Sequence, residues 1–376
     1  MEEQYFGVES RRSPSGGSRL AQPPKKPKKR PQKQRRNPLL TIGKIFYILL
    51  TVISAIIVVG YLAFTLLVPE PEVVEPDPVP EIPVVQPENP TVEDPVQTEG
   101  PQREPLVRRE GVFNILVAGT DFEGVRTDTM IVASYDTKAQ TVGLVSVPRD
   151  TLVERGKGEN PRLVYGKGGL STRREEISDL LGIPIDYYVK VDLTGFIALV
   201  NQVGGVDFYV PCDMNYDDPY QNLSIHYTKG MQHLNGQQAM EVARFRQNNP
   251  DENGNVTGYW DTGRTETQQK LLIALGKKVL SLGSLTKING FVEIFNDYVK
   301  TDLKLSDMLY FASQAIYIDT AAGIQTATLQ GDGNATYRGV PYCYALDPQS
   351  TLDTVNALLN PYTRDLELDE LHIVIP

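Results

Sequence analysis

The feature that most constrains this chain is a run of 24 residues, from Ile45 to Val68, that contains no charged side chain. As an α-helix it would be about 36 Å long, which is enough to cross the roughly 30 Å hydrocarbon core of a bilayer. The apolar stretch of a cleaved signal peptide is shorter and ends in small residues. This run ends Thr-Leu-Leu-Val-Pro-Glu, so we predict a transmembrane helix over residues 45–68.

The charges on the two sides of this run differ in sign. Residues 1–44 carry 12 Lys and Arg against 3 acids, whereas the rest of the chain carries 25 bases against 44 acids. Basic segments stay on the cytoplasmic side and are attracted to anionic lipid. We therefore predict a basic cytoplasmic tail over residues 1–44 and a single-pass type II protein of the cell membrane, with its C-terminal domain extracellular. The acidic extracellular part argues against nucleic acid as a partner, because phosphate binding depends on a positive surface.

The next segment is rich in proline and acids. Residues 69–101 contain ten Pro, nine Asp or Glu and no Lys or Arg, a composition that cannot bury a core. We predict an extended extracellular linker over residues 69–107. Residues 69–101 alone, at about 3.1 Å per residue, could hold the domain up to roughly 100 Å from the membrane. Residues 108–376 would then form one folded catalytic domain.

Residues 108–376 alternate between strand and helix patterns, which predicts the α/β class. We expect a single α/β/α sandwich, in which one central sheet is covered by helices on both faces. Short runs rich in β-branched residues predict strands at 113–118, 129–135, 141–147, 187–191 and 206–210. Apolar residues at helical spacing predict helices at 173–181, 193–203, 237–245, 264–280 and 306–317, with Asp261 and Ser306 as expected N-caps.

Several common catalytic motifs are absent from the sequence. It has no GxxxxGK[ST], GxSxG, HExxH or GxGxxG, and its three histidines stand in no triad context. The two cysteines, Cys212 and Cys343, form no CxxC motif, and the sequence leaves open whether they pair. P-loop nucleotide binding, dinucleotide binding, and serine or zinc hydrolysis are therefore disfavoured.

Arg and Asp residues instead gather at the ends of the predicted strands. Asp121 follows the first strand, Arg126 and Asp128 open the second, and Arg149 and Asp150 close the third. Open α/β sheets bind ligands at such edges. These five residues are therefore candidates for a binding site.

A second group lies at the predicted helix ends. Arg244 and Arg246 flank Phe245, and Asp261, Arg264 and Gln268 follow at positions i, i+3 and i+7. Converging guanidinium groups favour a polyanion such as a phosphate ester, and carboxylates among them favour a divalent cation. For any single Arg–Asp pair, a surface ion pair with no function is the favoured interpretation. The position of the whole set at element ends favours a polyphosphate pocket that contains Mg²⁺.

These motifs, in their order and spacing, resemble those of the LytR-CpsA-Psr family of bacterial cell-envelope proteins, most strongly over residues 112–282. The motifs that carry the resemblance are Asn-Ile-Leu-Val-Ala-Gly-Thr-Asp at 114–121, Arg-Thr-Asp-Thr-Met at 126–130, Val-Ser-Val-Pro-Arg-Asp-Thr at 145–151, Val-Gly-Gly-Val at 203–206, Leu-Asn-Gly-Gln-Gln-Ala at 234–239, Arg-Phe-Arg at 244–246 and Asp-Thr-Gly-Arg at 261–264 with Gln-Gln at 268–269.

The resemblance implies a phosphotransferase that attaches a glycopolymer, such as teichoic acid or capsular polysaccharide, from a polyprenyl-pyrophosphate carrier to peptidoglycan. It implies that Asp121 and Asp128 hold Mg²⁺, and that Asp150 and Asp261 act with Arg149 in catalysis and orient the arginines. The residues implied to bind pyrophosphate are Arg126, Arg149, Arg244, Arg246, Arg264 and Gln268.

The chain departs from the family pattern at two positions. Arg162 stands where the family usually has Lys, and Thr267 stands where a second Arg is usual. The loss of a cation weakens the expected clamp on the donor. Two alternatives therefore stay open: a polyprenyl-pyrophosphate pyrophosphatase that uses water in place of the sugar hydroxyl, and a non-catalytic module that binds wall polymer and regulates.

Overall fold

The computed structural model describes residues 51–52, 54, 68–73, 103–121, 127–279 and 288–376. Its centre is a six-stranded mixed sheet with the order β10–β3–β2–β1–β4–β9. The pairs β1–β2, β2–β3 and β4–β9 are antiparallel, and β1–β4 and β3–β10 are parallel. The strands are β1 (Val112–Thr120), β2 (Thr127–Asp136), β3 (Thr141–Ser146), β4 (Tyr187–Asp192), β9 (Val299–Thr301) and β10 (Ile324–Thr328).

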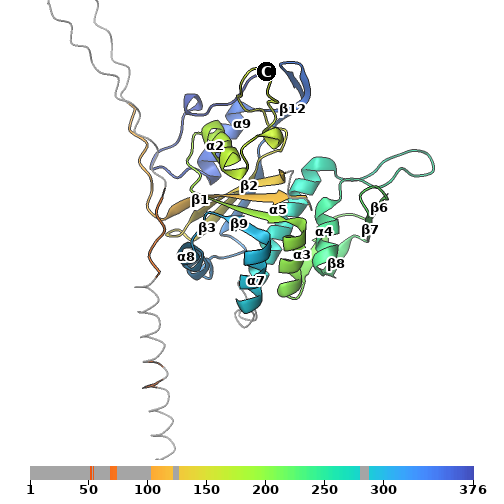
Figure 1. Cartoon of the computed structure of the whole chain (residues 1–376), viewed down its shortest axis with the longest axis horizontal. Coiled ribbons are helices and arrows are strands. Elements are labelled where there is room, and N and C mark those ends of the chain that lie inside the picture. The colour runs from red at the N-terminus through yellow and green to blue at the C-terminus, as the bar shows by residue number, and fades with distance from the viewer. Residues whose placement is uncertain (1–50, 53, 55–67, 74–102, 122–126, 280–287) are drawn as a thin grey trace, which may run out of the picture. The chain divides into compact units, whose positions relative to one another are not determined.

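Helices cover both faces of this sheet (Figure 1). One face carries α2 (Leu170–Leu181) and α9 (Pro348–Leu358), and the other carries α3 (Leu193–Gln202), α7 (Ile288–Tyr298) and α8 (Leu305–Ala315). The central residues of β2, Met130 to Val132, are buried in succession because neither face of the sheet meets water. The predicted α/β class is therefore confirmed as a mixed α/β fold.

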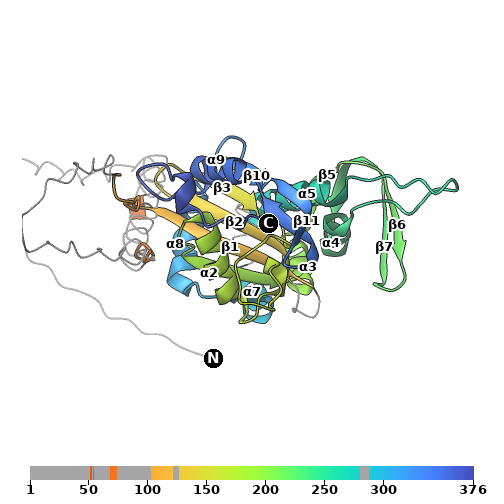
Figure 2. The same cartoon turned by 90° about the horizontal axis from the view of Figure 1, so that it is seen from above.

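The second core lies beside the sheet, around α3, α4 (Gly236–Arg244) and α5 (Trp260–Val279). Two hairpin-like sheets pack there, β5 (Val206–Val210) with β8 (Gly230–Leu234), and β6 (Met214–Asp218) with β7 (Leu223–Tyr227). Figure 2 shows β6 and β7 projecting from the rest of the domain.

The expectation of one sheet is wrong for residues 206–210, which form a strand but pair with β8 outside the central sheet. Their side chains alternate between buried and exposed, as in a sheet that has one face in contact with water. Helices instead cover both faces of the central sheet (Figure 1). A third small sheet, β11 (Gly331–Tyr337) with β12 (Val340–Leu346), was not predicted. The remaining short elements are the 3-10 helices η1 (Leu163–Tyr165) and η2 (Leu368–Glu370).

Two predicted helix starts also need correction. Helix α5 begins at Trp260, so Asp261 lies in its first turn and is not its N-cap. The N-cap of α8 is Lys304 and not Ser306; the side chain of Asp307, three residues further on, accepts a hydrogen bond from the Lys304 backbone N–H. The two cysteines are unpaired, and Cys343 is buried.

Part of the predicted linker lies against the domain. Pro71 is buried, Glu70 forms an ion pair with Lys138 (3.4 Å), and the Tyr187 hydroxyl donates to the carbonyl of Glu72 (2.7 Å). We call residues 68–73 the strap. The rest of the linker up to residue 102, and all of the predicted transmembrane helix except residues 51–52, 54 and 68, lie outside the described residues. Within the described part of the chain, no helix is long and apolar enough to cross a membrane.

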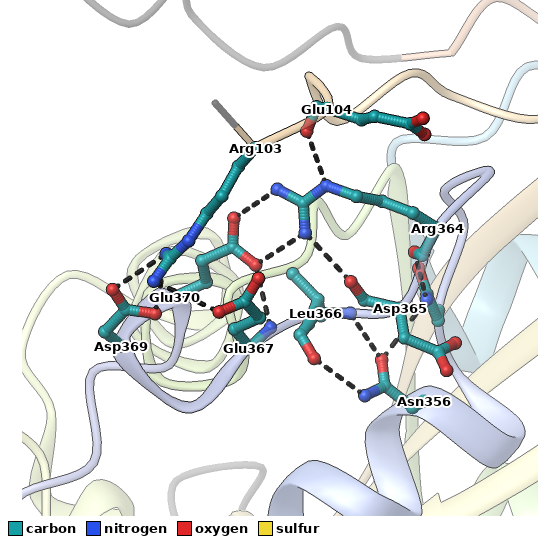
Figure 3. A network of polar contacts seen from close by, with 10 residues as sticks. Arg103, Glu104, Asn356, Arg364, Asp365, Leu366, Glu367, Asp369 and Glu370 are labelled. Atoms are coloured by element: carbon teal, nitrogen blue, oxygen red, sulfur yellow. Dashed lines mark hydrogen bonds and ion pairs between the residues drawn. The ribbon is translucent and has the colours of Figure 1, made fainter. Parts of the chain in front are cut away.

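The beginning and end of the described domain are tied together by a polar network (Figure 3). Arg103 forms an ion pair with Asp369 (2.8 Å), and Arg364 binds Glu370 through two hydrogen bonds of 2.9 and 2.6 Å. The Nε of Arg364 also donates to the carbonyl of Glu104 (2.6 Å). The folded unit therefore includes Arg103 and Glu104, which precede the predicted boundary at residue 108.

Candidate active site

A cavity of about 340 Å³ opens at the edge of the sheet where β1 ends and β2 begins. Five of the ten predicted site residues line it: Asp128, Arg149, Asp150, Arg264 and Gln268. They come from the start of β2, the segment after β3, and α5, the last of which follows the other two by more than 100 residues in the chain. The structure thus brings half of the predicted set into one cavity.

The side chain of Asp128 is placed there by an irregularity in β2. Gly119 pairs with Thr129, but the next residue of β1, Thr120, pairs with Thr127, so Asp128 is an extra residue in the ladder. Such a bulge bends the strand and redirects a side chain, and bulges are frequent beside active sites. The bulge accounts for an acidic side chain at the start of a strand whose central residues, Met130 to Val132, are buried and apolar.

Arg149 is held by two carboxylates. Its Nη1 donates to Asp128 (2.5 Å) and its Nε donates to Asp150 (3.3 Å). Burial opposes its charge, but the hydrogen bond that Arg149 donates to Asp128 and the charges of both carboxylates outweigh burial and raise the pKa of Arg149. The guanidinium is therefore permanently charged and fixed in orientation, with one edge at the cavity.

Helix α5 is fixed against the sheet by two adjacent glutamines. Gln268 accepts a hydrogen bond from the Thr129 hydroxyl (3.2 Å) and donates to the carbonyl of Ala243 (3.1 Å). Gln269 is buried and donates to the Ser146 hydroxyl (2.9 Å) and to a carbonyl of β10. The sequence analysis gave Gln269 no role. These contacts set the position of Arg264, which lies one turn earlier on the same helix.

Arg244 lies next to the cavity but does not line it. Its Nη2 donates to the side chain of Gln221 (2.7 Å) in the turn between β6 and β7. Burial lowers the pKa of Arg244, and the charge of Asp128 opposes that shift, which places the two groups within electrostatic reach. Arg244 thus lies at the rim of the cavity, on the side of the turn between β6 and β7.

Arg246 is the second arginine at the end of α4, and its side chain also lies outside the cavity lining. Phe245 between the two arginines is buried. The carbonyl of Arg246 accepts hydrogen bonds from the backbone N–H groups of Tyr259 (3.1 Å) and Trp260 (2.8 Å). Its backbone therefore helps to fix the start of α5.

Two further predicted residues cannot be placed. Arg126 lies outside the described residues, and of Asp261 only the backbone is described. Asp121 is described, directly after β1, and its charge acts on Lys190 of the neighbouring strand β4. Burial lowers the pKa of Lys190, as do the cations Lys300 and Arg173, while Asp121 opposes that shift.

The carboxylates of the candidate site suit a divalent cation only if a bound phosphate compound supplies the remaining oxygen ligands. Among the described residues, no three His, Cys, Asp or Glu side chains are grouped closely enough to hold a metal. Asp121 directly follows the end of β1, and Asp128 lies near the start of the adjacent strand β2. Mg²⁺ takes one or two carboxylates when phosphate oxygens supply the rest of its ligands. A cation at Asp128 would share that carboxylate with Arg149. The residues therefore fit Mg²⁺ that arrives with phosphate.

The two departures from the family pattern lie in different surroundings. The Nη1 of Arg162 is 3.8 Å from Asp150, and its guanidinium stacks over the ring of Tyr165 at 4.6 Å. A cation is thus kept beside Asp150. Thr267 is buried and does not line the cavity.

One wall of the cavity was missed by the sequence analysis. Gly333, Tyr342 and Tyr344 of the β11–β12 sheet line it, together with the Arg and Asp side chains. Tyr342 is exposed and has a positive φ of 57°, a backbone conformation that bulky residues rarely adopt. The only sequence signal was a Tyr-Cys-Tyr run at residues 342–344, which has no distinctive spacing.

Comparison with known proteins agrees with this arrangement. Residues 86–360 match the LytR_cpsA_psr family. The polyisoprenyl-teichoic acid–peptidoglycan teichoic acid transferase TagV of Bacillus subtilis (strain 168) is 34% identical over 251 residues, which cover 64% of this chain and 61% of TagV. The corresponding transferase TagU of Enterococcus faecalis (strain ATCC 700802 / V583) is 33% identical over 230 residues, or 59% of this chain and 71% of TagU.

The crystal structure of B. subtilis TagV has the same fold. It matches with a TM-score of 0.56 and 29% sequence identity, over 68% of this chain and 100% of the TagV chain in that structure. The match to TagV spans less than two thirds of the full length of that protein. With most of its length matched, including the central sheet and the residues around the cavity, the chain belongs to the LytR_cpsA_psr family.

Proposed function

We propose that this protein transfers a polyprenyl-pyrophosphate-linked glycopolymer, of the teichoic acid or capsular polysaccharide type, to peptidoglycan. The observation that carries the proposal is the single cavity that joins Arg149 and Arg264 to Asp128, Asp150 and Gln268. Two permanent cations beside fixed carboxylates suit a pyrophosphate better than a neutral substrate. The relatives TagV and TagU, named as teichoic acid transferases, support the same reaction.

In this proposal the chain's own residues position the donor and neutralise its charge. Arg149 and Arg264 bind the oxygens of the pyrophosphate, and Asp128 and Asp150 keep Arg149 in the orientation that does so. Arg244 and Arg246, with Arg126, would hold the donor from the rim. Phosphoryl transfer depends mainly on such positioning and electrostatic stabilisation.

The transfer step itself is a substitution at phosphorus. A sugar hydroxyl of peptidoglycan attacks the phosphorus that carries the glycopolymer, a new P–O bond forms, and the bond to the bridging oxygen of the pyrophosphate breaks. The products are a phosphodiester and a polyprenyl phosphate. A carboxylate at the cavity accepts the proton of the hydroxyl; Asp150 lines the cavity, and Asp261 lies in the first turn of the helix that carries Arg264.

Mg²⁺, held by Asp121 and Asp128 with the phosphate oxygens, would neutralise charge on the pyrophosphate when bound. The setting proposed for this chemistry is the outer face of the cell membrane, with residues 45–68 as the anchor and residues 1–44 in the cytoplasm. Both donor and acceptor are then on the same side as the domain.

The proposal is tested with full-length protein in detergent, a labelled lipid-linked glycopolymer and isolated peptidoglycan, with Mg²⁺ and with a chelator. Wild type should transfer label to peptidoglycan, chelation should stop it, and Arg264→Ala should slow it about 100-fold, the usual cost of losing one electrostatic stabiliser. Lys270→Ala is the matched control, because it removes an exposed cation from the same helix.

The outcomes separate the three candidate functions. Label that appears on peptidoglycan supports the transferase. Release of free glycopolymer phosphate without transfer would instead identify a pyrophosphatase, and binding of the donor with neither product would identify a non-catalytic module.

A further inference from the structure

The outward face of α8 is apolar. Between Leu305 and Tyr317 every exposed residue is apolar or aromatic: Leu305, Leu309, Ala312, Ile316 and Tyr317. Leu305 is 66% exposed and Ile316 is 59% exposed. A surface helix normally turns polar residues outward, and a contiguous exposed apolar patch marks an interaction site. We call these five residues the α8 stripe.

The opposite face of α8 is firmly packed. The ring of Phe311 lies 5.0 Å from that of Phe113 in β1 and 6.2 Å from that of Tyr187 in β4, and Tyr310 is buried. The helix therefore has a fixed orientation, and the stripe is not an alternative core face that could turn inward.

The strap lies beside this helix. Burial raises the pKa of the Tyr310 hydroxyl in α8, and the nearby Glu70 carboxylate raises it further. Tyr187, which contacts Phe311, donates a hydrogen bond to the carbonyl of Glu72. Figures 1 and 2 both show α8 at the end of the sheet where the strap lies.

Chain connectivity relates this end of the domain to the membrane. The predicted transmembrane helix ends at Val68, and Glu70 and Pro71 already contact the domain. Three residues of extended chain reach no more than about 11 Å. If residues 45–68 span the membrane, the bilayer surface lies close to the strap and to α8.

We propose that the α8 stripe docks into the outer leaflet of the membrane, so that the domain rests on the bilayer and does not stand away from it. The inference rests on the proposed anchor at residues 45–68. An amphipathic helix that lies in the interface buries its apolar face about 5–10 Å deep, and the apolar residues of the stripe suit that environment.

The candidate active site lies far from this contact. Strand β1 begins beside the strap end of the domain, and the cavity lies at its other end, after nine residues. At about 3.3 Å per residue the cavity is roughly 25–30 Å from the strap along the strand.

The test uses tryptophan fluorescence, because Trp260 is the sole tryptophan of the chain. Full-length Trp260→Phe protein is reconstituted into vesicles of brominated phosphatidylcholine, which quench indole at the lipid interface. In that background Ile316→Trp should lose about half of its emission, as expected for a side chain a few ångströms below the surface. The matched control is Tyr220→Trp, at the fully exposed turn between β6 and β7, which should be unquenched.

A second variant tests the contact itself. Leu305→Glu/Leu309→Glu, added to the Ile316→Trp protein, should abolish the quenching without lowering the melting temperature, since both leucines are exposed. Vesicle flotation is measured in parallel. Protein that floats but shows no quenching with Ile316→Trp, or equal quenching with Tyr220→Trp, refutes docking and leaves the anchor intact. Protein that does not float refutes the anchor and the docking together.

Discussion

Two Arg–Asp pairs at opposite ends of β1 show how the same chemistry serves different purposes. At the start of the strand Arg108 binds Asp186 through two hydrogen bonds of 2.9 and 3.1 Å, and the two side chains are 9% and 0% exposed. Near its end Arg149 divides its donors between Asp128 and Asp150, and Arg149 and Asp128 are each 32% exposed. The first pair is closed on all sides, whereas the second borders a cavity.

The closed pair is part of the architecture. The Nη2 of Arg108 also donates to the carbonyl of Val112 (2.9 Å), and Asp186 accepts from the backbone N–H of Asn114 (2.8 Å). These bonds join the start of β1 to the residue before β4. The open pair instead holds a charged group ready for a ligand, so exposure and the number of partners distinguish the two roles, not residue type.

The largest effect is expected for Arg108→Ala. This change leaves the buried Asp186 carboxylate without its cation, which should lower the free energy of unfolding by about 3–5 kcal/mol. Urea denaturation of the full chain in detergent measures it. Arg109→Ala is the matched control, because the neighbouring Arg109 pairs with Asp136 from a more exposed position, and should cost no more than about 1 kcal/mol. An equal loss of unfolding free energy in both variants would contradict the conclusion that the buried pair stabilises the fold more than an exposed one does.

An intermediate effect is expected for Arg149→Ala, and it should fall on donor binding and not on the stability of the fold. Binding of a short-chain polyprenyl pyrophosphate should weaken by about 1.5–3 kcal/mol, the range for charged hydrogen bonds. The fold should change by no more than about 1 kcal/mol, because the pair is partly exposed. Arg149→Lys should restore binding only in part, since an ammonium cannot reproduce the guanidinium fork. Calorimetric titration beside thermal melts measures both, and an unchanged affinity would remove Arg149 from the site.

The smallest effect is expected for Arg103→Ala. Arg103 is half-exposed and divides its charge between Asp369 (2.8 Å) and Glu367 (3.1 Å). Loss of such a surface pair should lower the melting temperature by no more than about 2 °C, and added salt should reduce even that difference.

The same pair also predicts a pH dependence. The hydrogen bond from Arg103 holds the pKa of Asp369 below its usual value. The stabilisation is therefore present above the ordinary aspartate pKa and is lost as the pH falls through the folded value. Melting curves of wild type and Arg103→Ala should converge in acid, and curves that diverge there would contradict this account.

Sequence patterns predicted the strands β1 to β4 to within a few residues, because each is a short run rich in β-branched and aromatic residues. They did not predict the sheet that residues 206–210 would join, since the residue pattern of a strand does not show which other strand it pairs with. Of the five residues that line the cavity, Asp128, Arg149 and Asp150 were predictable because they stand at or beside strand ends, and Arg264 and Gln268 because of their helical spacing after Asp261. The wall formed by Tyr342 and Tyr344 was not, because a long-range return of the chain brings it there.

The order of the strands has a consequence for how the protein is made. Both edge strands of the central sheet, β9 and β10, come from the last third of the chain, whereas the four strands between them lie before residue 193. Until residues 299–328 have emerged, β3 and β4 present unpaired edges, which invite pairing with other chains. A ribosome that stalls before that point, or a truncation there, should leave an aggregation-prone intermediate and not a smaller stable domain.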